Sequence, residues 1–171
     1  MRIRIAAVVA VAGLALAGCG SAAAPRTAAS SASPASSTAA ASGPATAAQI
    51  AHRLKADGMD VTQLIVYTPA TDPNHLMGRQ GGYTSKVSWV DPSAVASGAG
   101  NPRDDPGGIE YGGGIEVFPD HASAQARYDE LKPLTAPFGD GYDYLHGNAV
   151  LRLSQYLVPS IAQEYAAKFA S

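Results

Sequence analysis

The sequence predicts an α+β domain, in which an antiparallel sheet of about five strands carries helices packed on one face. Several short segments alternate apolar and polar residues, as strands do, and they follow one another closely, which favours antiparallel neighbours. Three other segments repeat apolar residues at helical spacing. Residues 47–171 provide one domain's length of chain, enough to bury a core without disulfide bonds or a metal.

The first expected helix lies between Thr46 and Gly58. Thr46-Ala47-Ala48-Gln49 matches a capping box, in which the threonine and glutamine side chains satisfy N–H groups at the start of the helix. Apolar residues then recur at helical spacing. Gly58 suits the position just after a helix, where the backbone turns left-handed, and Met59 can close this cap through an apolar contact.

Three strands are expected next, because their residues are largely β-branched or aromatic. They are 63–68, 86–90 and 114–118. Trp89 alternates with Val87 on the second strand, so we expect the single tryptophan to pack in the core rather than stack on a ligand. Residues 92–113 are rich in Gly, Pro and Asp and predict a long loop.

A second helix is expected from Asp120, as its N-cap, to about Lys132, where Pro133 should stop it. Its apolar stripe is Ala124, Tyr128 and Leu131. Strands 142–146 and 149–154 follow, and Gly147-Asn148 between them suits a type II′ hairpin turn.

The last helix, 159–170, opens with Pro159 at its first position. Its inward face is formed by Ile161, Tyr165 and Phe169, which recur every four residues. The expected order of elements is therefore α-β-β-β-α-β-β-α.

The N-terminal segment predicts export and lipidation. Arg2 and Arg4 precede an apolar run of about a dozen residues, which suits the core of a signal peptide and is too short to span a bilayer. The run ends in Leu16-Ala17-Gly18-Cys19, which is similar to the lipobox of bacterial lipoproteins. We therefore expect residues 1–18 to be a signal peptide and Cys19, the only cysteine, to carry the lipid, palmitate included.

Residues 19–46 predict a flexible tether that begins at the lipidated cysteine. They are almost wholly Ala, Ser, Thr, Pro and Gly, and so lack the large apolar side chains that offset the entropy of ordering. The whole chain has 12 Lys and Arg against 14 Asp and Glu; without Arg2 and Arg4, 10 remain against 14, a balance of −4. With this balance there is no excess of positive charge to attract nucleic acid, so we expect no nucleic-acid partner.

The segment DPNHLMGRQGGYTSK, residues 72–86, holds the best candidates for contact with a ligand or partner. These candidates are Asp72, Asn74, His75, Arg79, Tyr83 and Lys86. The same segment also has a structural interpretation, since its Asp, Pro, Asn and Gly residues predict a turn. Arg79 and Lys86 would then pair with carboxylates such as Asp72 or Asp91, while Leu76 and Met77 would hold the loop to the core.

Known catalytic and metal-binding motifs do not match. Lys86 follows the serine rather than preceding it, and a strand comes next, so the segment is not a phosphate-binding loop. A calcium site from Asp104, Asp105 and Glu110 is conceivable, but the order of an EF-hand is missing. No S-x-x-K, G-x-S-x-G or H-E-x-x-H motif occurs. We therefore expect no metal, no cofactor and no enzymatic activity.

The chain resembles a group of small secreted actinobacterial lipoproteins. The resemblance covers essentially the whole domain and is carried by DPNHLMGRQGGYTSK, GGGIEVFPDHASAQARYDEL and YDYLHGNAVLRLSQYLVPSIAQEYAAKF. It implies a lipid-anchored extracytoplasmic domain and assigns no catalytic residue. One departure is Val158 before Pro159, where a Thr or Ser cap is expected; without it the last helix should start less firmly.

These observations predict a lipoprotein on the outer face of the cytoplasmic membrane, with a non-enzymatic binding or interaction domain at the cell envelope. Its expected partners are the membrane, through the lipid on Cys19, and an envelope protein or a small anionic ligand. The 72–86 loop would be the contact surface, together with the 92–113 loop. Two alternatives stay open: a small cell-envelope hydrolase or enzyme inhibitor, and a structural spacer lipoprotein.

Overall fold

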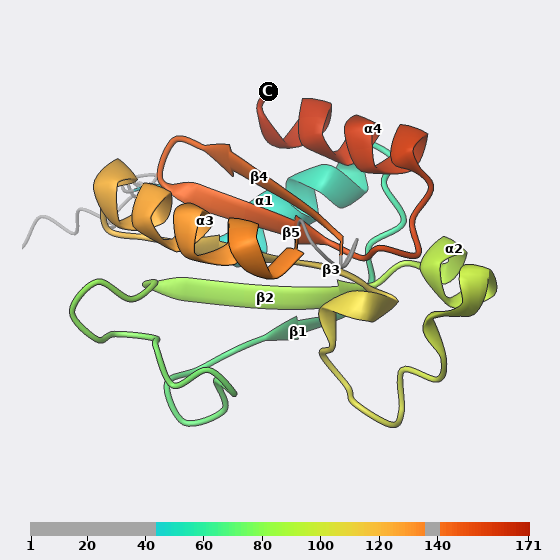
Figure 1. Ribbon diagram of the computed structural model, residues 1–171, viewed down its shortest axis with the longest axis horizontal. Coiled ribbons are helices and arrows are strands. Elements are labelled where there is room, and N and C mark those ends of the chain that lie inside the picture. Colours follow the sequence, from blue (N-terminus) through green and yellow to red (C-terminus); the bar gives the residue numbers. More distant parts are fainter. Residues whose placement is uncertain (1–43, 136–140) are drawn as a thin grey trace, which may run out of the picture. The chain divides into compact units, whose positions relative to one another are not determined.

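A computed structural model describes residues 44–135 and 141–171 and has the predicted α+β class (Figure 1). Its sheet is antiparallel and five-stranded, with strand order β1-β2-β3-β5-β4. The main elements are α1 (Ala47–Ala56), β1 (Thr62–Val66), β2 (Ser85–Val90), β3 (Gly112–Val117), α3 (His121–Thr135), β4 (Tyr142–His146), β5 (Ala149–Leu153) and α4 (Pro159–Phe169). The predicted signal peptide, Cys19 and most of the tether lie outside the described residues.

The ends of α1 follow the predicted local signals. Thr46 and Gln49 form both hydrogen bonds of a capping box. Gly58 has φ +90°, and the Met59 N–H donates to the Leu54 carbonyl at 3.0 Å. Met59 is buried and belongs to the main core. The sequence therefore determines both ends of this helix locally.

The helices cover both faces of the sheet, which corrects the expectation of a single covered face. α1 and α4 pack on the face that presents Val87, Trp89 and Ile115. α3 packs on the opposite face, where Ala124 and Leu131 join Val150 of β5 and where Leu145 of β4 packs against them (Figure 1). The reason is that β5 is apolar on both faces, so that each face must be covered.

α3 continues past Pro133 to Thr135, whereas the sequence analysis expected it to stop at Lys132. A proline removes one hydrogen bond and crowds the carbonyl four residues earlier. Here it falls in the last turn, so only the end of the helix is affected. The predicted start is confirmed, since the Ser123 N–H donates to Oδ1 of Asp120 at 2.7 Å.

The long connection 92–113 contains short elements that the sequence did not predict. They are α2 (Pro92–Ala94), the single turn η1 (Val95–Ala99) and the 3₁₀ turn η2 (Ile109–Tyr111). Asp91 caps α2 through Ser93 and also accepts a hydrogen bond from the Tyr165 hydroxyl at 2.8 Å. This buried carboxylate therefore ties the start of the connection to α4.

The β4–β5 hairpin has the predicted Gly147-Asn148 turn. Gly147 has φ +56°, and Asn148 is not among the described residues with positive φ. This combination is the one that a type II′ turn requires.

The N-cap of α4 offers a direct test of a local signal. Val158 occupies this position in extended conformation, makes no side-chain cap and is 50 % exposed. Val158→Ser should therefore raise the free energy of unfolding by about 1 kcal/mol, because the hydroxyl satisfies an N–H at the start of the helix. Urea denaturation followed by circular dichroism measures the change. Val158→Ala removes the apolar side chain without adding a cap and should give no comparable gain; an equal gain would reject this explanation.

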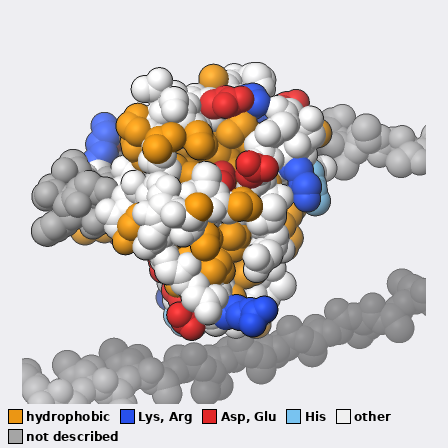
Figure 2. Space-filling model, turned by 90° about the vertical axis from the view of Figure 1, so that its right-hand side faces the viewer, with side chains coloured by type: hydrophobic (Ala, Val, Ile, Leu, Met, Phe, Trp, Pro, Cys, Tyr) orange, Lys and Arg blue, Asp and Glu red, His pale blue; other side chains and the backbone are white. Residues whose placement is uncertain are grey.

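Figure 2 shows the molecule from the right-hand end of Figure 1, where α2 lies. On this face the Lys and Arg side chains stand apart from one another, among hydrophobic and uncharged ones. Among residues 44–135 and 141–171, no helix combines the length and apolar character needed to cross a bilayer.

Candidate functional site

A cleft of about 490 Å³ lies on the sheet face that α3 covers only in part. One wall comes from the connection after β1, at residues 67–74, and the other from residues 105–110 before β3. Lys86 of β2 and Arg152 of β5 complete the lining. We call this hollow the sheet cleft. It brings together the two loops that the sequence predicts as a contact surface.

Asp72 is the centre of the loop before β2. Its side chain is buried, and Oδ2 accepts hydrogen bonds from the backbone N–H groups of Leu76 and Met77 at 2.9 and 3.1 Å. Oδ1 accepts from the Tyr83 hydroxyl at 2.6 Å and from Lys86 Nζ at 3.2 Å. The Asp72 carboxylate therefore accepts hydrogen bonds from backbone N–H groups of this loop that no helix or strand satisfies, as an Asx turn does over fewer residues.

The pKa of Asp72 is held well below its ordinary value of 3.8. Burial alone would raise this pKa, but the hydrogen bonds from Tyr83, the Leu76 and Met77 N–H groups and Lys86 outweigh it. Burial and the neighbouring Asp72 carboxylate raise the pKa of Tyr83. Asp72 is therefore charged and Tyr83 neutral at physiological pH.

Lys86 stands between this buried network and the sheet cleft. It is 6 % exposed and lines the cleft, while Nζ contacts Asp72 Oδ1 and, at 3.5 Å, the Tyr83 hydroxyl. Nζ also lies 4.9 Å from the ring centroid of Tyr67. An ammonium has three N–H donors, so these two oxygen acceptors leave one for a ligand.

Tyr67 connects the two walls of the cleft. Its hydroxyl lies 3.0 Å from Oγ of Ser88 on β2 and donates to the Gly107 carbonyl at 3.4 Å. Gly107 has φ +113°, and a methyl group there would overlap the Tyr67 hydroxyl. A glycine is thus required where the 105–110 wall meets Tyr67.

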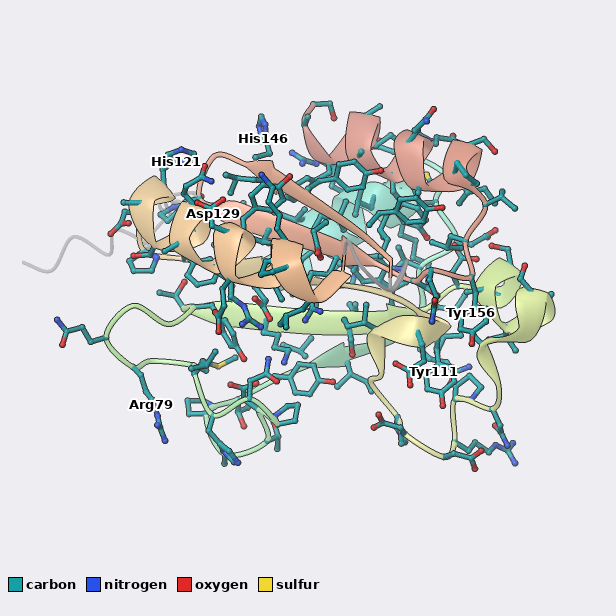
Figure 3. The ribbon with its side chains drawn as sticks, viewed as in Figure 1. Arg79, Tyr111, His121, Asp129, His146 and Tyr156 are labelled. Atoms are coloured by element: carbon teal, nitrogen blue, oxygen red, sulfur yellow. The ribbon has the colours of Figure 1, made fainter. Side chains whose placement is uncertain are left out.

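The six predicted contact residues fall into three groups. Asp72, Tyr83 and Lys86 form the buried network. Asn74 lines the sheet cleft together with Lys86. His75 and Arg79 are exposed and do not line the cleft; Arg79 points away from the sheet (Figure 3). The structural interpretation of the loop is confirmed for the Lys86–Asp72 pair and for Leu76 and Met77, which pack against the smaller core cluster.

The glycines of this loop have the expected roles. Gly78 and Gly81 have φ +75° and +76°. A methyl group on Gly82 would overlap the Leu76 carbonyl oxygen, so this glycine permits a close backbone approach.

Three charged residues of the cleft were not among the predicted contacts: Arg152, Asp105 and Glu110. Arg152 pairs with Asp143 on the neighbouring strand β4, with Nε and Oδ1 3.4 Å apart. The available signal was its charge in the apolar run AVLRLS, which is unusual for a central strand. Asp105 and Glu110 were considered only as calcium ligands. Within the described residues, no cluster of three or more His, Cys, Asp or Glu side chains is arranged to hold a metal ion.

The depressed pKa of Asp72 predicts how stability depends on pH. A carboxyl with a lowered folded-state pKa contributes stability above its unfolded pKa, near 3.9, and this contribution is lost as the pH falls toward the folded value. The stability difference between wild type and Asp72→Asn should therefore be constant from about pH 6 to 7 and shrink below about pH 4. Urea denaturation of both proteins across this range measures it. A difference that stays constant down to about pH 2 would contradict the prediction.

No protein-family model matches the chain, and no match was found among curated proteins or solved structures.

Proposed function

We propose that the chain is a lipid-anchored extracytoplasmic protein whose domain binds a small ligand in the sheet cleft without chemically altering it. The observation that carries the proposal is the cleft itself. Its volume of about 490 Å³ is in the range of small-molecule sites, and polar groups from several elements converge on it. The floor belongs to a hydrogen-bonded sheet, which keeps Lys86 and Arg152 in fixed relative positions.

The character of the lining favours binding over catalysis. No His, Cys or Ser is among the described residues that line the cleft. All four histidines are exposed, and Figure 3 shows His121 and His146 toward the end of the sheet away from Tyr111 and Tyr156. An acyl-transfer site would need a nucleophile within hydrogen-bond reach of a base. Lys86 and Arg152 are instead each paired with a carboxylate, and this pairing holds the two side chains in place for binding a ligand.

Ligand binding is tested with the full chain purified in detergent. A library of amino acids, peptides, sugars, nucleotides and organic acids is screened by the shift in melting temperature, because a ligand that binds only the folded state raises it. Asn74→Trp should fill the cleft and abolish the shift, whereas Gln80→Trp, on the same loop and away from the cleft, should retain it. The proposal fails if no compound shifts the wild type or if the shifts persist in Asn74→Trp. Turnover of any bound compound would favour the hydrolase alternative.

The anchor is tested separately. The basic start, the apolar run and the sequence Leu16-Ala17-Gly18-Cys19 support lipidation. Cys19→Ser should move the protein from the membrane fraction to the soluble fraction and prevent incorporation of labelled palmitate. Labelled palmitate on the Cys19→Ser protein would overturn this part of the proposal.

A further inference from the structure

Arg152 lies where two hollows meet. It lines the sheet cleft and also a second hollow of about 530 Å³, bordered by Ala99, Gln155 and Tyr156. Ile109 and Glu110 of η2 line both hollows as well. The two hollows are therefore adjacent along Ile109, Glu110 and Arg152, so a ligand in either one lies beside the guanidinium of Arg152.

The guanidinium of Arg152 is paired with one carboxylate, yet its terminal nitrogens keep their hydrogen-bond donors. Its one close partner is the Asp143 carboxylate, at 3.4 Å from Nε, and the buried Nε makes no hydrogen bond with any described residue. Neither terminal nitrogen donates a hydrogen bond within the described part of the chain. The side chain is 23 % exposed, so Asp143 holds the group by charge while the N–H donors of its two terminal nitrogens remain available. Such a fork matches the two oxygens of a carboxylate.

Negatively charged side chains share the cleft with Arg152. Asp105 lines the sheet cleft, and Glu110 lines both hollows. Burial raises the pKa of the neighbouring Tyr111, and the charges of Glu110, Asp104 and Asp105 raise it further. None of these three carboxylates forms an ion pair with a described residue. They are therefore available to a cationic group.

The balance of charge decides the class of ligand. The two cations of the cleft, Lys86 and Arg152, are each paired with a buried carboxylate, and two further carboxylates stand on the wall. Because Asp143 already compensates the charge of Arg152, this side chain offers directed N–H donors rather than net positive charge, which suits a single carboxylate. A multiply charged anion such as phosphate would be repelled by the two carboxylates on the wall. A molecule with one carboxylate and one ammonium provides a partner for Arg152 and another for Asp105 and Glu110.

We propose that the sheet cleft binds a free amino acid or short peptide as a zwitterion, with its carboxylate on Arg152 and its ammonium beside Asp105 and Glu110. This inference rests on the proposed binding function and names its ligand class. The two end groups are what is recognised, and the volume of about 490 Å³ accommodates a short peptide.

The test is calorimetric titration of the full chain with L-alanyl-L-alanine and with alanine. N-acetyl-L-alanyl-L-alanine lacks the ammonium, and L-alanyl-L-alaninamide lacks the carboxylate. Each blocked dipeptide should bind at least about tenfold more weakly than the free one, because each loses a charge-assisted contact. Inorganic phosphate should not compete. Equal binding of a blocked form, competition by phosphate, or no heat from either zwitterion would overturn the inference.

Variants connect the binding to these residues. Arg152→Gln alone strands Asp143 in a buried position, so the double variant Arg152→Gln/Asp143→Asn removes the pair as a unit. It should weaken L-alanyl-L-alanine at least about tenfold. Lys132→Gln/Asp129→Asn makes the same charge change at an exposed ion pair on α3, outside both hollows, and should bind normally. Asp105→Asn/Glu110→Gln should abolish the preference for the free dipeptide over its acetylated form.

The two proposals fail in different ways. If a sugar or nucleotide shifts the melting temperature, and Asn74→Trp removes that shift while zwitterions give no heat, the ligand class is wrong and the binding function stands. If no compound binds the cleft, both proposals fail.

Discussion

Asp72→Ala is expected to lower the free energy of unfolding by about 3–5 kcal/mol, because it strands the Lys86 ammonium in a buried position. The substitution also leaves the Leu76 and Met77 N–H groups and the Tyr83 hydroxyl without their acceptor. Each buried donor left unsatisfied adds its own desolvation cost. Urea denaturation followed by circular dichroism provides the measurement.

Lys86→Met is the informative comparison for this network. It removes the cation but leaves Asp72 with its backbone donors and the Tyr83 hydroxyl, so it should cost clearly less than Asp72→Ala. A smaller loss for Asp72→Ala than for Lys86→Met would mean that the carboxylate does not organise the loop.

The second large effect is expected at the contact between α3 and the sheet. Arg127→Met should lower the free energy of unfolding by about 3–5 kcal/mol, because Glu116 on β3 is buried and loses its partner. Arg127 Nε donates to Glu116 Oε2 at 2.9 Å, and its Nη2 donates to Oε1 at 3.4 Å. Thermal and urea denaturation measure the loss.

Two variants separate the buried pair from the exposed one. Arg127 also pairs with Glu130, whose side chain is 63 % exposed, so Glu130→Gln should change stability by no more than about 1 kcal/mol. Glu116→Gln/Arg127→Met removes both charges and should recover much of the loss, since no buried ion remains unpaired. A double variant as unstable as Arg127→Met would show that the loss comes from packing rather than charge.

Local signals predicted most elements because they act within a few residues. Thr46 and Asp120 cap helices through hydroxyl or carboxylate oxygens three residues from their donors, and Gly58 ends α1 by its own φ. The same holds for the Gly147 turn. By contrast, Pro133 led us to predict the end of α3 too early, because the effect of a proline depends on how much of the helix remains beyond it.

The candidate site depended on contacts between distant parts of the chain. The composition of residues 72–86 suggested either a binding site or a structural turn. The loop proves to be a turn organised by Asp72 that also places Lys86 next to Tyr67 and in the lining of the cleft, which composition alone did not show. Arg152 was not identified because its neighbours come from other parts of the chain. Asp143 lies beside it through the pairing of β4 with β5, and Glu110 reaches the same cleft from the end of the long connection. The second covered face likewise follows from which strands become neighbours, a property that alternation within a strand does not determine.

The single tryptophan gives this protein a built-in spectroscopic reporter. Trp89 is 2 % exposed, lies 5.8 Å from the Tyr165 ring and belongs to the core between the sheet and the helices α1 and α4. Lys86 and Arg152, which line the sheet cleft, belong to the other face of the sheet. A ligand in the cleft should therefore leave the indole emission almost unchanged, whereas global unfolding should shift it to longer wavelength. Fluorescence thus follows loss of the core separately from occupancy of the cleft.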